Sequence, residues 1–164
     1  MKENLIKKLD NNDFKAFEIQ GHTELEFVNA QDFDEAQYGF RFNPKENKEI
    51  DDWKKMVDEN AYVIGRVCNL GDPIIADAGD ENFPIYCMMH DDWTSLEKVS
   101  NSFDEFIENL KALDKMINLE HQDKNSVLEF VKKLDSKNGS FFYEDICYYV
   151  LNDDILCHGE QNIK

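Results

Sequence analysis

His90, Asp91 and Asp92 are consecutive, and their residue types could do acid–base or metal chemistry. A histidine oriented by a carboxylate can act as a general base, and the same groups could bind a divalent cation. Cys87 adds a C-x-x-H spacing with His90, but no second ligand pair follows at a recognisable spacing. A hydrolase or metal-binding enzyme built on these residues is therefore one alternative.

The longer motifs of enzymes do not occur in this sequence. It contains no H-E-x-x-H, no G-x-S-x-G, no P-loop and no G-x-G-x-x-G, and the other three histidines lie in unrelated contexts. A single histidine at the end of a strand is more often a surface or interface residue. We therefore expect no enzymatic activity, no catalytic residue, no metal site and no cofactor.

The cysteines predict the redox compartment. Cys68, Cys87, Cys147 and Cys157 form no C-x-x-C pair, and a chain of 164 residues is long enough to build a core without disulfides. The first residues have no apolar run typical of a signal peptide, and no stretch approaches the length of a membrane span. We expect a cytoplasmic protein with reduced, inert thiols.

The net charge of −17 comes from 35 acidic and 18 basic residues. Residues 67–110 alone hold ten carboxylates and one lysine, so more than half of the excess lies there. Nucleic acids and anionic membranes are polyanions, and we exclude both as main partners. A basic protein partner is compatible with this charge.

Apolar runs separated by turn residues predict strands in the centre of the chain. Residues 61–68, 73–77 and 84–90 are rich in β-branched and aromatic residues, and the short turns between them favour an antiparallel meander. In the first 60 residues, the patterns predict a short helix at Leu5–Leu9, strands at 23–28 and 38–42, and a helical turn at 51–57.

Helices are predicted after the meander. Apolar residues between Leu96 and Ile117 recur at helical spacing, and Ser100 or Ser102 could cap the helix, with Glu105 three residues after Ser102. A second helix is predicted at about 125–134, and residues 140–151 are apolar enough to dock on the core as a helix or a strand. We therefore expect one α+β domain over residues 1–155, with a curved, mostly antiparallel sheet flanked by helices and a loose tail at 156–164.

The carboxylates of the central region lie in or beside the predicted turns. If those turns meet at one end of the sheet, the carboxylates form an anionic rim that could dock a cationic partner. The alternative is that Asp is common there because it suits the backbone of turns. The candidate partner-binding residues are Asp72, Asp77, Asp80, Glu81, Asp91 and Asp92, with His90 and Trp93 as possible anchors.

Several short motifs follow one another at close spacing over residues 60–110. In order, they are Tyr62-Val63-Ile64-Gly65, Leu70-Gly71-Asp72-Pro73-Ile74-Ile75, Asp77, Pro84-Ile85-Tyr86, His90 and Val99-x-x-Ser102-Phe103-x-x-Phe106-Ile107-x-x-Leu110. Together they resemble the SUKH superfamily, which includes the Smi/Knr cell-wall regulator domain of yeasts and many bacterial immunity proteins. The N-terminal residues 1–45 do not reproduce the leucine-proline-x-x-tyrosine helix or the asparagine-glycine-glycine turn of many members.

The resemblance implies an α+β domain without enzymatic activity. The bacterial relatives are antidotes against polymorphic toxins, often nucleases, so the partner implied here is a cognate toxin domain. A nuclease needs a cationic cleft for phosphates, which an acidic antidote could cover. The second hypothesis is an intracellular scaffold or regulator of the Smi/Knr kind that binds another protein.

Overall fold

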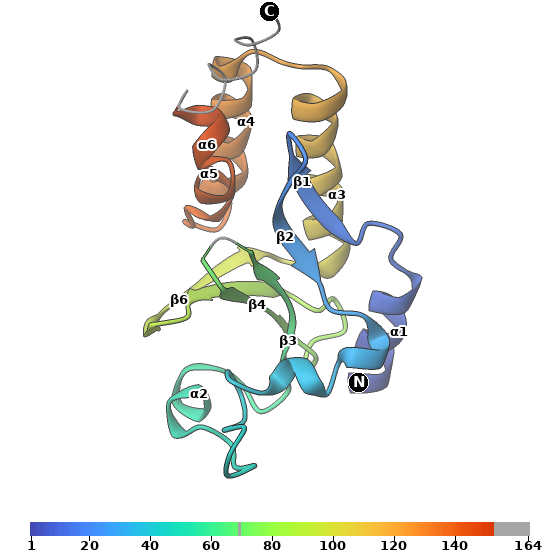
Figure 1. Ribbon diagram of the computed structural model, residues 1–164, viewed down its shortest axis with the longest axis vertical. Coiled ribbons are helices and arrows are strands. Elements are labelled where there is room, and N and C mark those ends of the chain that lie inside the picture. The colour runs from blue at the N-terminus through green and yellow to red at the C-terminus, as the bar shows by residue number, and fades with distance from the viewer. Residues whose placement is uncertain (69, 153–164) are drawn as a thin grey trace, which may run out of the picture.

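The strands form one curved antiparallel sheet whose order follows the chain. The computed structural model describes residues 1–68 and 70–152, apart from the side chains of Trp93 and Tyr149 (Figure 1). Each strand pairs with the next one in the chain, so the predicted three-strand meander is the centre of a longer one, and the α+β fold class is confirmed. The strands are β1 (Ala16–Ile19), β2 (His22–Phe27), β3 (Ala61–Val67), β4 (Asp72–Asp77), β5 (Ile85–Met89) and β6 (Asp92–Ser100).

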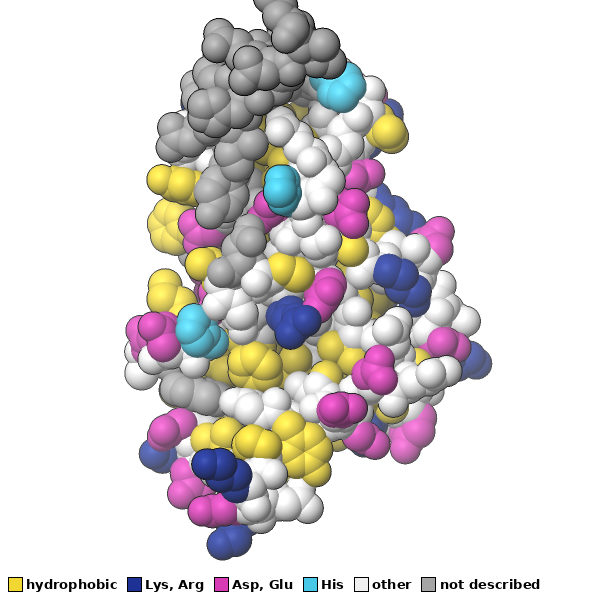
Figure 2. All heavy atoms as spheres, in the orientation of Figure 1, with side chains coloured by type: hydrophobic (Ala, Val, Ile, Leu, Met, Phe, Trp, Pro, Cys, Tyr) yellow, Lys and Arg dark blue, Asp and Glu magenta, His cyan; other side chains and the backbone are white. Residues whose placement is uncertain are grey.

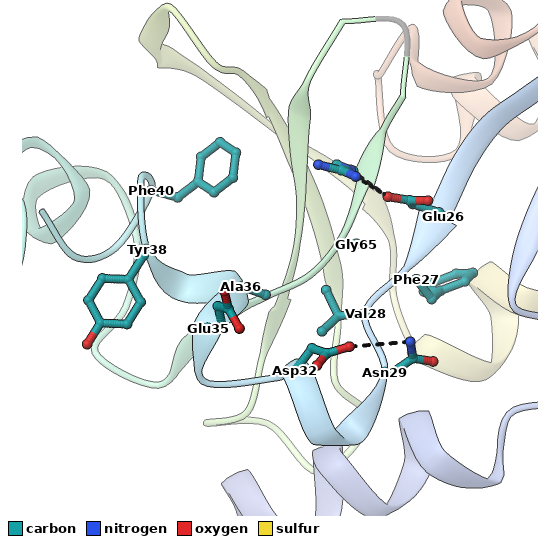
Figure 3. A pocket seen from close by; sticks show the side chains of 11 residues that line it. Glu26, Phe27, Val28, Asn29, Asp32, Glu35, Ala36, Tyr38, Phe40 and Gly65 are labelled. Atoms are coloured by element: carbon teal, nitrogen blue, oxygen red, sulfur yellow. Dashed lines mark hydrogen bonds and ion pairs between the residues drawn. The ribbon is translucent and has the colours of Figure 1, made fainter. Parts of the chain in front are cut away.

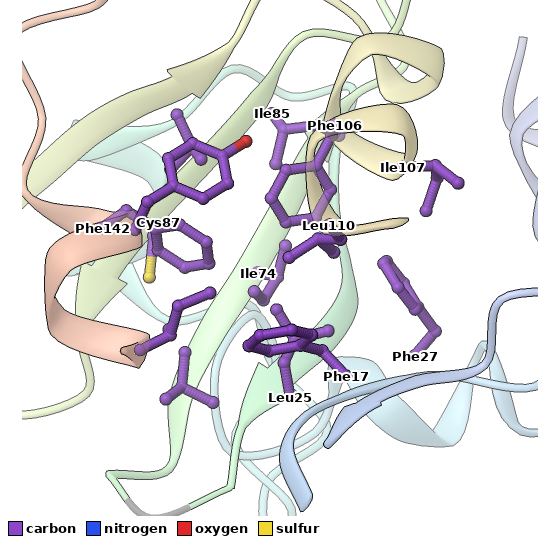
Figure 4. Close-up of a cluster of buried hydrophobic side chains, with 14 of the residues drawn as sticks. Phe17, Leu25, Phe27, Ile74, Ile85, Cys87, Phe106, Ile107, Leu110 and Phe142 are labelled. Atoms are coloured by element: carbon purple, nitrogen blue, oxygen red, sulfur yellow. The ribbon is translucent and has the colours of Figure 1, made fainter. Parts of the chain in front are cut away.

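Helices from both ends of the chain cover one face of this sheet (Figure 1). Phe106 lies near the centre of the resulting core, and its ring centroid is 6.0 Å from that of Phe27 and 5.7 Å from that of Phe142 (Figure 4). Truncating a buried ring of this kind costs about 3–5 kcal/mol. The helical elements on this face are α1 (Lys2–Asn11), α3 (Phe103–Asp114), its π-helical continuation η3 (Lys115–Leu119), α4 (Lys124–Ser136), α5 (Phe142–Ile146) and α6 (Tyr148–Leu151).

A smaller apolar cluster covers the other face of the sheet. The helical turn predicted at 51–57 is α2 (Asp51–Met56), and its Trp53 side chain packs on Val63, Ile75 and Met88 with only 1% of its surface exposed. Successive residues of β4 therefore face different clusters, because Ile74 belongs to the main core and Ile75 to the smaller one. Burial on both faces explains why the central strands are apolar runs rather than alternating patterns.

Residues 38–42 do not form the predicted strand. They make only isolated bridges, from Tyr38 to Phe42 and from Phe42 to Glu49, after two 3-10 turns, η1 (Ala30–Asp32) and η2 (Glu35–Gln37). Gly39 has φ +91°, in the left-handed region that favours glycine, and this conformation interrupts the strand. The alternating apolar pattern belongs instead to a loop with aromatic side chains.

The side chains of Gln37 and Arg41 form hydrogen bonds with the backbone of the first half of β3, where a neighbouring strand would otherwise pair. The Gln37 amide donates to Val63 O at 2.9 Å and accepts from Val63 N at 2.9 Å, and Arg41 Nη1 donates to Ala61 O at 3.0 Å. Because β2 pairs with β3 only at Gly65–Val67, these bonds satisfy backbone groups that would otherwise lack a partner at this edge.

The apolar residues at helical spacing start at Leu96, but the helix itself begins at Phe103, after the second of the two expected caps. Leu96 and Val99 are three residues apart, as on a helix face, but both belong to β6 and face opposite sides of the sheet. The helical periodicity was wrong for 96–100. The apolar residues at the end of β6 and those of the following helix lie at spacings that resemble one continuous helix. The expected cap is confirmed: Ser102 Oγ accepts a hydrogen bond from Glu105 N at 3.1 Å.

The segment 140–151, which the pattern left undecided, forms the short helices α5 and α6. Their apolar residues Phe142, Ile146 and Leu151 are buried in the main core. The predicted domain boundary at 155 and the tail at 156–164 lie outside the described residues. Within the described part of the chain, no helix combines the length and the apolar character that crossing a bilayer requires.

Candidate protein-binding surface

The predicted anionic rim is split between the two ends of the sheet. In an antiparallel meander, successive turns lie at opposite ends, and a six-residue strand spans about 20 Å. Asp72 and the β5–β6 turn with His90 and Asp91 therefore lie at one end. Asp77, Asp80 and Glu81 lie at the other end, in and beside the β4–β5 turn, so the expectation of a single rim was wrong.

Several of these carboxylates hold the backbone of their own turns. Asp77 Oδ1 accepts from Gly79 N at 2.7 Å, and Asp80 Oδ1 accepts from Asn82 N at 2.8 Å. Asp92 Oδ1 accepts from the backbone N and the hydroxyl of Thr94, which lowers the pKa of Asp92. Turn chemistry, the alternative stated above, therefore accounts for these three positions.

Asp72 and His90 meet across two neighbouring strands. Asp72 Oδ1 accepts from His90 N at 2.8 Å and lies 2.9 Å from His90 Nδ1. The Asp72 side chain is only 10% exposed, whereas the imidazole is half exposed. The hydrogen bond to Asp72 raises the pKa of His90. The pair therefore braces the β5–β6 turn against the start of β4, and Asp72 has little surface left for a partner.

A hollow of about 420 Å³ opens beside this pair, between the β3–β4 turn, the β5–β6 hairpin and α5. We call it the hairpin hollow. Buried apolar side chains line it, including Val67, Cys87, Phe142 and Ile146. Figure 2 shows acidic and apolar side chains next to each other where β6 begins. The rim consists of Leu70, Met89, Asp91, Glu97, Phe141 and Asp145.

The three apolar residues of the rim are unusually exposed. Leu70 and Met89 each expose 54% of their surface, and Phe141 exposes 68%. They come from three separate segments, the β3–β4 turn, the end of β5 and the residue before α5. Apolar side chains gathered around a hollow and bordered by polar groups are typical of protein interaction sites.

Apart from His90, which is paired with Asp72, the ionisable groups of acidic or basic residues around the hollow are all carboxylates. Asp91, Glu97 and Asp145 line the hollow with Asp72, and none of the described residues that line it is a lysine or arginine. Burial raises the pKa of Glu97 and of Asp145, and neighbouring carboxylates raise both further. Within residues 1–68 and 70–152, neither Glu97 nor Asp145 forms an ion pair.

Asp135 positions the α5 side of the hollow. Its carboxylate accepts from Tyr143 N at 3.0 Å, Glu144 N at 2.9 Å and Ser140 Oγ at 2.9 Å. Asp135 therefore caps α5 from the end of α4, and it is only 4% exposed. Burial raises the pKa of Asp135 although the three donors oppose the shift.

The sequence prediction missed Leu70, Met89, Glu97, Phe141 and Asp145 as site residues. Single exposed apolar residues and single carboxylates on strands or helices are common, so only their proximity in space distinguishes these five. Trp93, a predicted anchor, lies in β6 next to Asp92, and its side chain is outside the described part of the structure. Glu81 and Asp91 are exposed, as expected for turn residues.

The thiols and histidines form no reactive centre in the described structure. Burial raises the pKa of Cys87 and Cys147, and it also raises that of the partly exposed Cys68. Cys157 lies outside the described residues. Among the residues described, no three His, Cys, Asp or Glu side chains lie close enough together to hold a metal ion.

A second hollow, of about 540 Å³, lies on the face of β2 and β3 near the 30–40 loop (Figure 3). Tyr38, Phe40 and Val28 contribute apolar surface to it. Its charges are partly compensated, because Arg66 Nε donates to Glu26 Oε1 at 2.6 Å. This second hollow is larger than the hairpin hollow. Because of the Arg66–Glu26 pair, it offers a partner less uncompensated negative charge.

Comparisons of the chain with protein-family models, with curated proteins and with solved structures give no match.

Proposed function

We propose that this chain is a non-enzymatic immunity protein that binds and neutralises a cognate bacterial toxin domain in the cytoplasm. The observation that carries the proposal is the hairpin hollow, where exposed Leu70, Met89 and Phe141 lie among carboxylates that no described lysine or arginine of the lining neutralises. Such a surface favours a protein partner of positive charge.

A nuclease domain is the toxin class that this charge suits. Its active site must hold phosphates, so it carries a cationic cleft that an acidic protein can cover. A net charge of −17 also accelerates the encounter with a basic partner through long-range attraction. Neutralisation then needs no chemistry from the antidote, only a stable complex that blocks the cleft.

The resemblance to the SUKH superfamily supports the same proposal. Two residues that carry it, Asp72 and His90, form the brace beside the hairpin hollow. Another motif of the resemblance, Ser102-Phe103-x-x-Phe106, forms the start of helix α3, which packs on the sheet. Apart from Leu70, which also stands at the rim, these residues of the resemblance build the framework, while the exposed rim residues would select the individual partner.

The test is capture followed by rescue. The tagged protein is used to capture proteins from its native host, and the captured domain is then expressed in a second bacterium with and without this chain. The proposal expects a basic domain that stops growth alone and permits growth when this chain is co-expressed. Capture of a non-toxic regulatory or cell-wall-synthesis protein would instead favour the scaffold hypothesis.

A further inference from the structure

We infer that the hairpin hollow accepts a segment of the partner in which one apolar side chain is flanked by arginine or lysine. The inference rests on the proposed function, because it assumes that the partner is a protein. It adds the chemistry of the occupant and its place on this chain. Both follow from the shape and the charge of the hollow.

The lining of the hollow suits an apolar side chain of the occupant. Val67, Phe142 and Ile146 present buried apolar surface to the hollow, and exposed Met89 and Phe141 stand at its rim. A hollow of about 420 Å³ has room for a side chain of the size of leucine together with neighbouring backbone. Entry of an apolar side chain removes both surfaces from water, which is the main source of affinity at such a site.

The carboxylates of the rim suit positive charges on either side of that apolar side chain. Asp91 lies in the β5–β6 turn, Glu97 in β6 and Asp145 in α5, so carboxylates approach the hollow from different segments. Glu97 is partly buried and Asp145 is exposed, and neither has a cationic partner in the described structure. A guanidinium or ammonium group at the rim would stabilise their charged forms and recover part of their desolvation cost. An anionic or neutral segment would bring no such gain.

The hollow is also held in shape before binding. Asp135 fixes the first turn of α5, and the Asp72–His90 pair fixes the β5–β6 turn. A site whose walls are already ordered loses less conformational entropy when it binds. This framework distinguishes the hairpin hollow from a loose acidic surface.

The experiment titrates the isotopically labelled full chain with a defined probe, the peptide acetyl-Gly-Arg-Leu-Lys-Gly-amide, and follows backbone amide signals by NMR. We expect saturable shifts at Leu70, Met89, Glu97 and Phe141. Replacing the leucine of the peptide by glycine should weaken binding by about fivefold. Replacing both cations by glutamate should abolish it.

Two matched double variants locate the site. Glu97→Gln/Asp145→Asn should lose the peptide-induced shifts, whereas Asp80→Asn/Glu81→Gln, at the other end of the sheet, should keep them. Unchanged signals from the core show that each variant is folded. Shifts centred on residues 77–82, or equal binding of the glycine peptide, would overturn the inference.

The two proposals fail separately. If a toxin is captured and neutralised but the peptide does not bind in the hollow, the occupant is wrong and the immunity function stands. If the peptide binds as expected but rescue fails with every captured domain, the hollow is a site for basic segments and the immunity function is wrong.

Discussion

Asp72 and His90, 18 residues apart in the chain, are joined at a single carboxylate oxygen. Asp72 Oδ1 accepts from the backbone N of His90 and lies 2.9 Å from its Nδ1. The contact connects the start of β4 with the β5–β6 turn, so it sets the position of one wall of the hairpin hollow. The stability and the binding surface of this protein are therefore linked at this pair.

The Asp72–His90 pair should make the stability of the protein depend on pH. The pKa of His90 is raised in the folded protein, so its stabilising contribution is complete below the ordinary histidine pKa of about 6.5 and is lost as the pH rises through the folded value. His90→Ala should therefore lower the Tm more at about pH 5.5 than at about pH 9. Thermal unfolding measures both, and His22→Ala, at an exposed position of β2, is the control. An effect that grows with pH would contradict the assignment.

Asp135→Ala should destabilise the protein by about 2 kcal/mol, because it removes the cap of α5 and leaves two backbone N–H groups without their acceptor. Asp135→Asn keeps one oxygen acceptor and should cost less. Urea unfolding provides the free energies, and Glu129→Ala, on the exposed face of α4, should change stability by no more than about 0.5 kcal/mol. Equal stability of Asp135→Ala and wild type would show that α5 does not depend on this cap.

Gly65→Ala should cost about 2 kcal/mol or more, because a Cβ at this position would lie 2.6 Å from the backbone oxygen of Glu26 in the neighbouring strand. The backbone at residue 65 has no positive φ, so the cause is the close approach and not the conformation of glycine. Gly79→Ala is the matched control, since its nearest atom belongs to the Asp77 side chain, which can move. Urea unfolding of the two variants should show the larger loss for Gly65→Ala, and the reverse order would refute the packing argument.

If the partner is the basic toxin domain that we propose, its association with this chain should slow as the salt concentration rises. Long-range attraction between a chain of charge −17 and a basic partner is screened by salt, whereas apolar contacts in the hairpin hollow are not. Stopped-flow or surface-based kinetics should therefore show a salt-dependent association rate and a dissociation rate that changes much less. An association rate independent of salt would rule out electrostatic steering.

The sequence predicted the strands of the meander well because their causes are local. Residues 61–67 and 72–77 are apolar runs bounded by turn residues, and Ser102 with Glu105 marks a helix start within four positions. The pattern failed at Leu96, where a strand residue stood at helical spacing from Val99. It failed again at residues 38–42, because Arg41 and the preceding Gln37 bind through their side chains to a strand 20 or more positions away.

The candidate site was predicted only in part, for the same reason. Asp72, His90 and Asp91 were found because turn residues stand out in a sequence, and they do lie together. Their separation from Asp77, Asp80 and Glu81 depends on strand direction, which fixes the end of the sheet for each turn. Asp135 and Asp145 gave no local signal, because one caps a helix that follows a loop and the other resembles any carboxylate on a short helix.

We propose that the hairpin hollow is the surface that binds the proposed toxin domain. The most direct test is the affinity of the captured toxin domain, measured by calorimetry, for wild type and for the two double variants. We predict that Glu97→Gln/Asp145→Asn weakens binding by about tenfold or more and abolishes growth rescue. Asp80→Asn/Glu81→Gln should stay within about twofold of wild type. Equal weakening by both variants, or no effect of the first, would contradict the account.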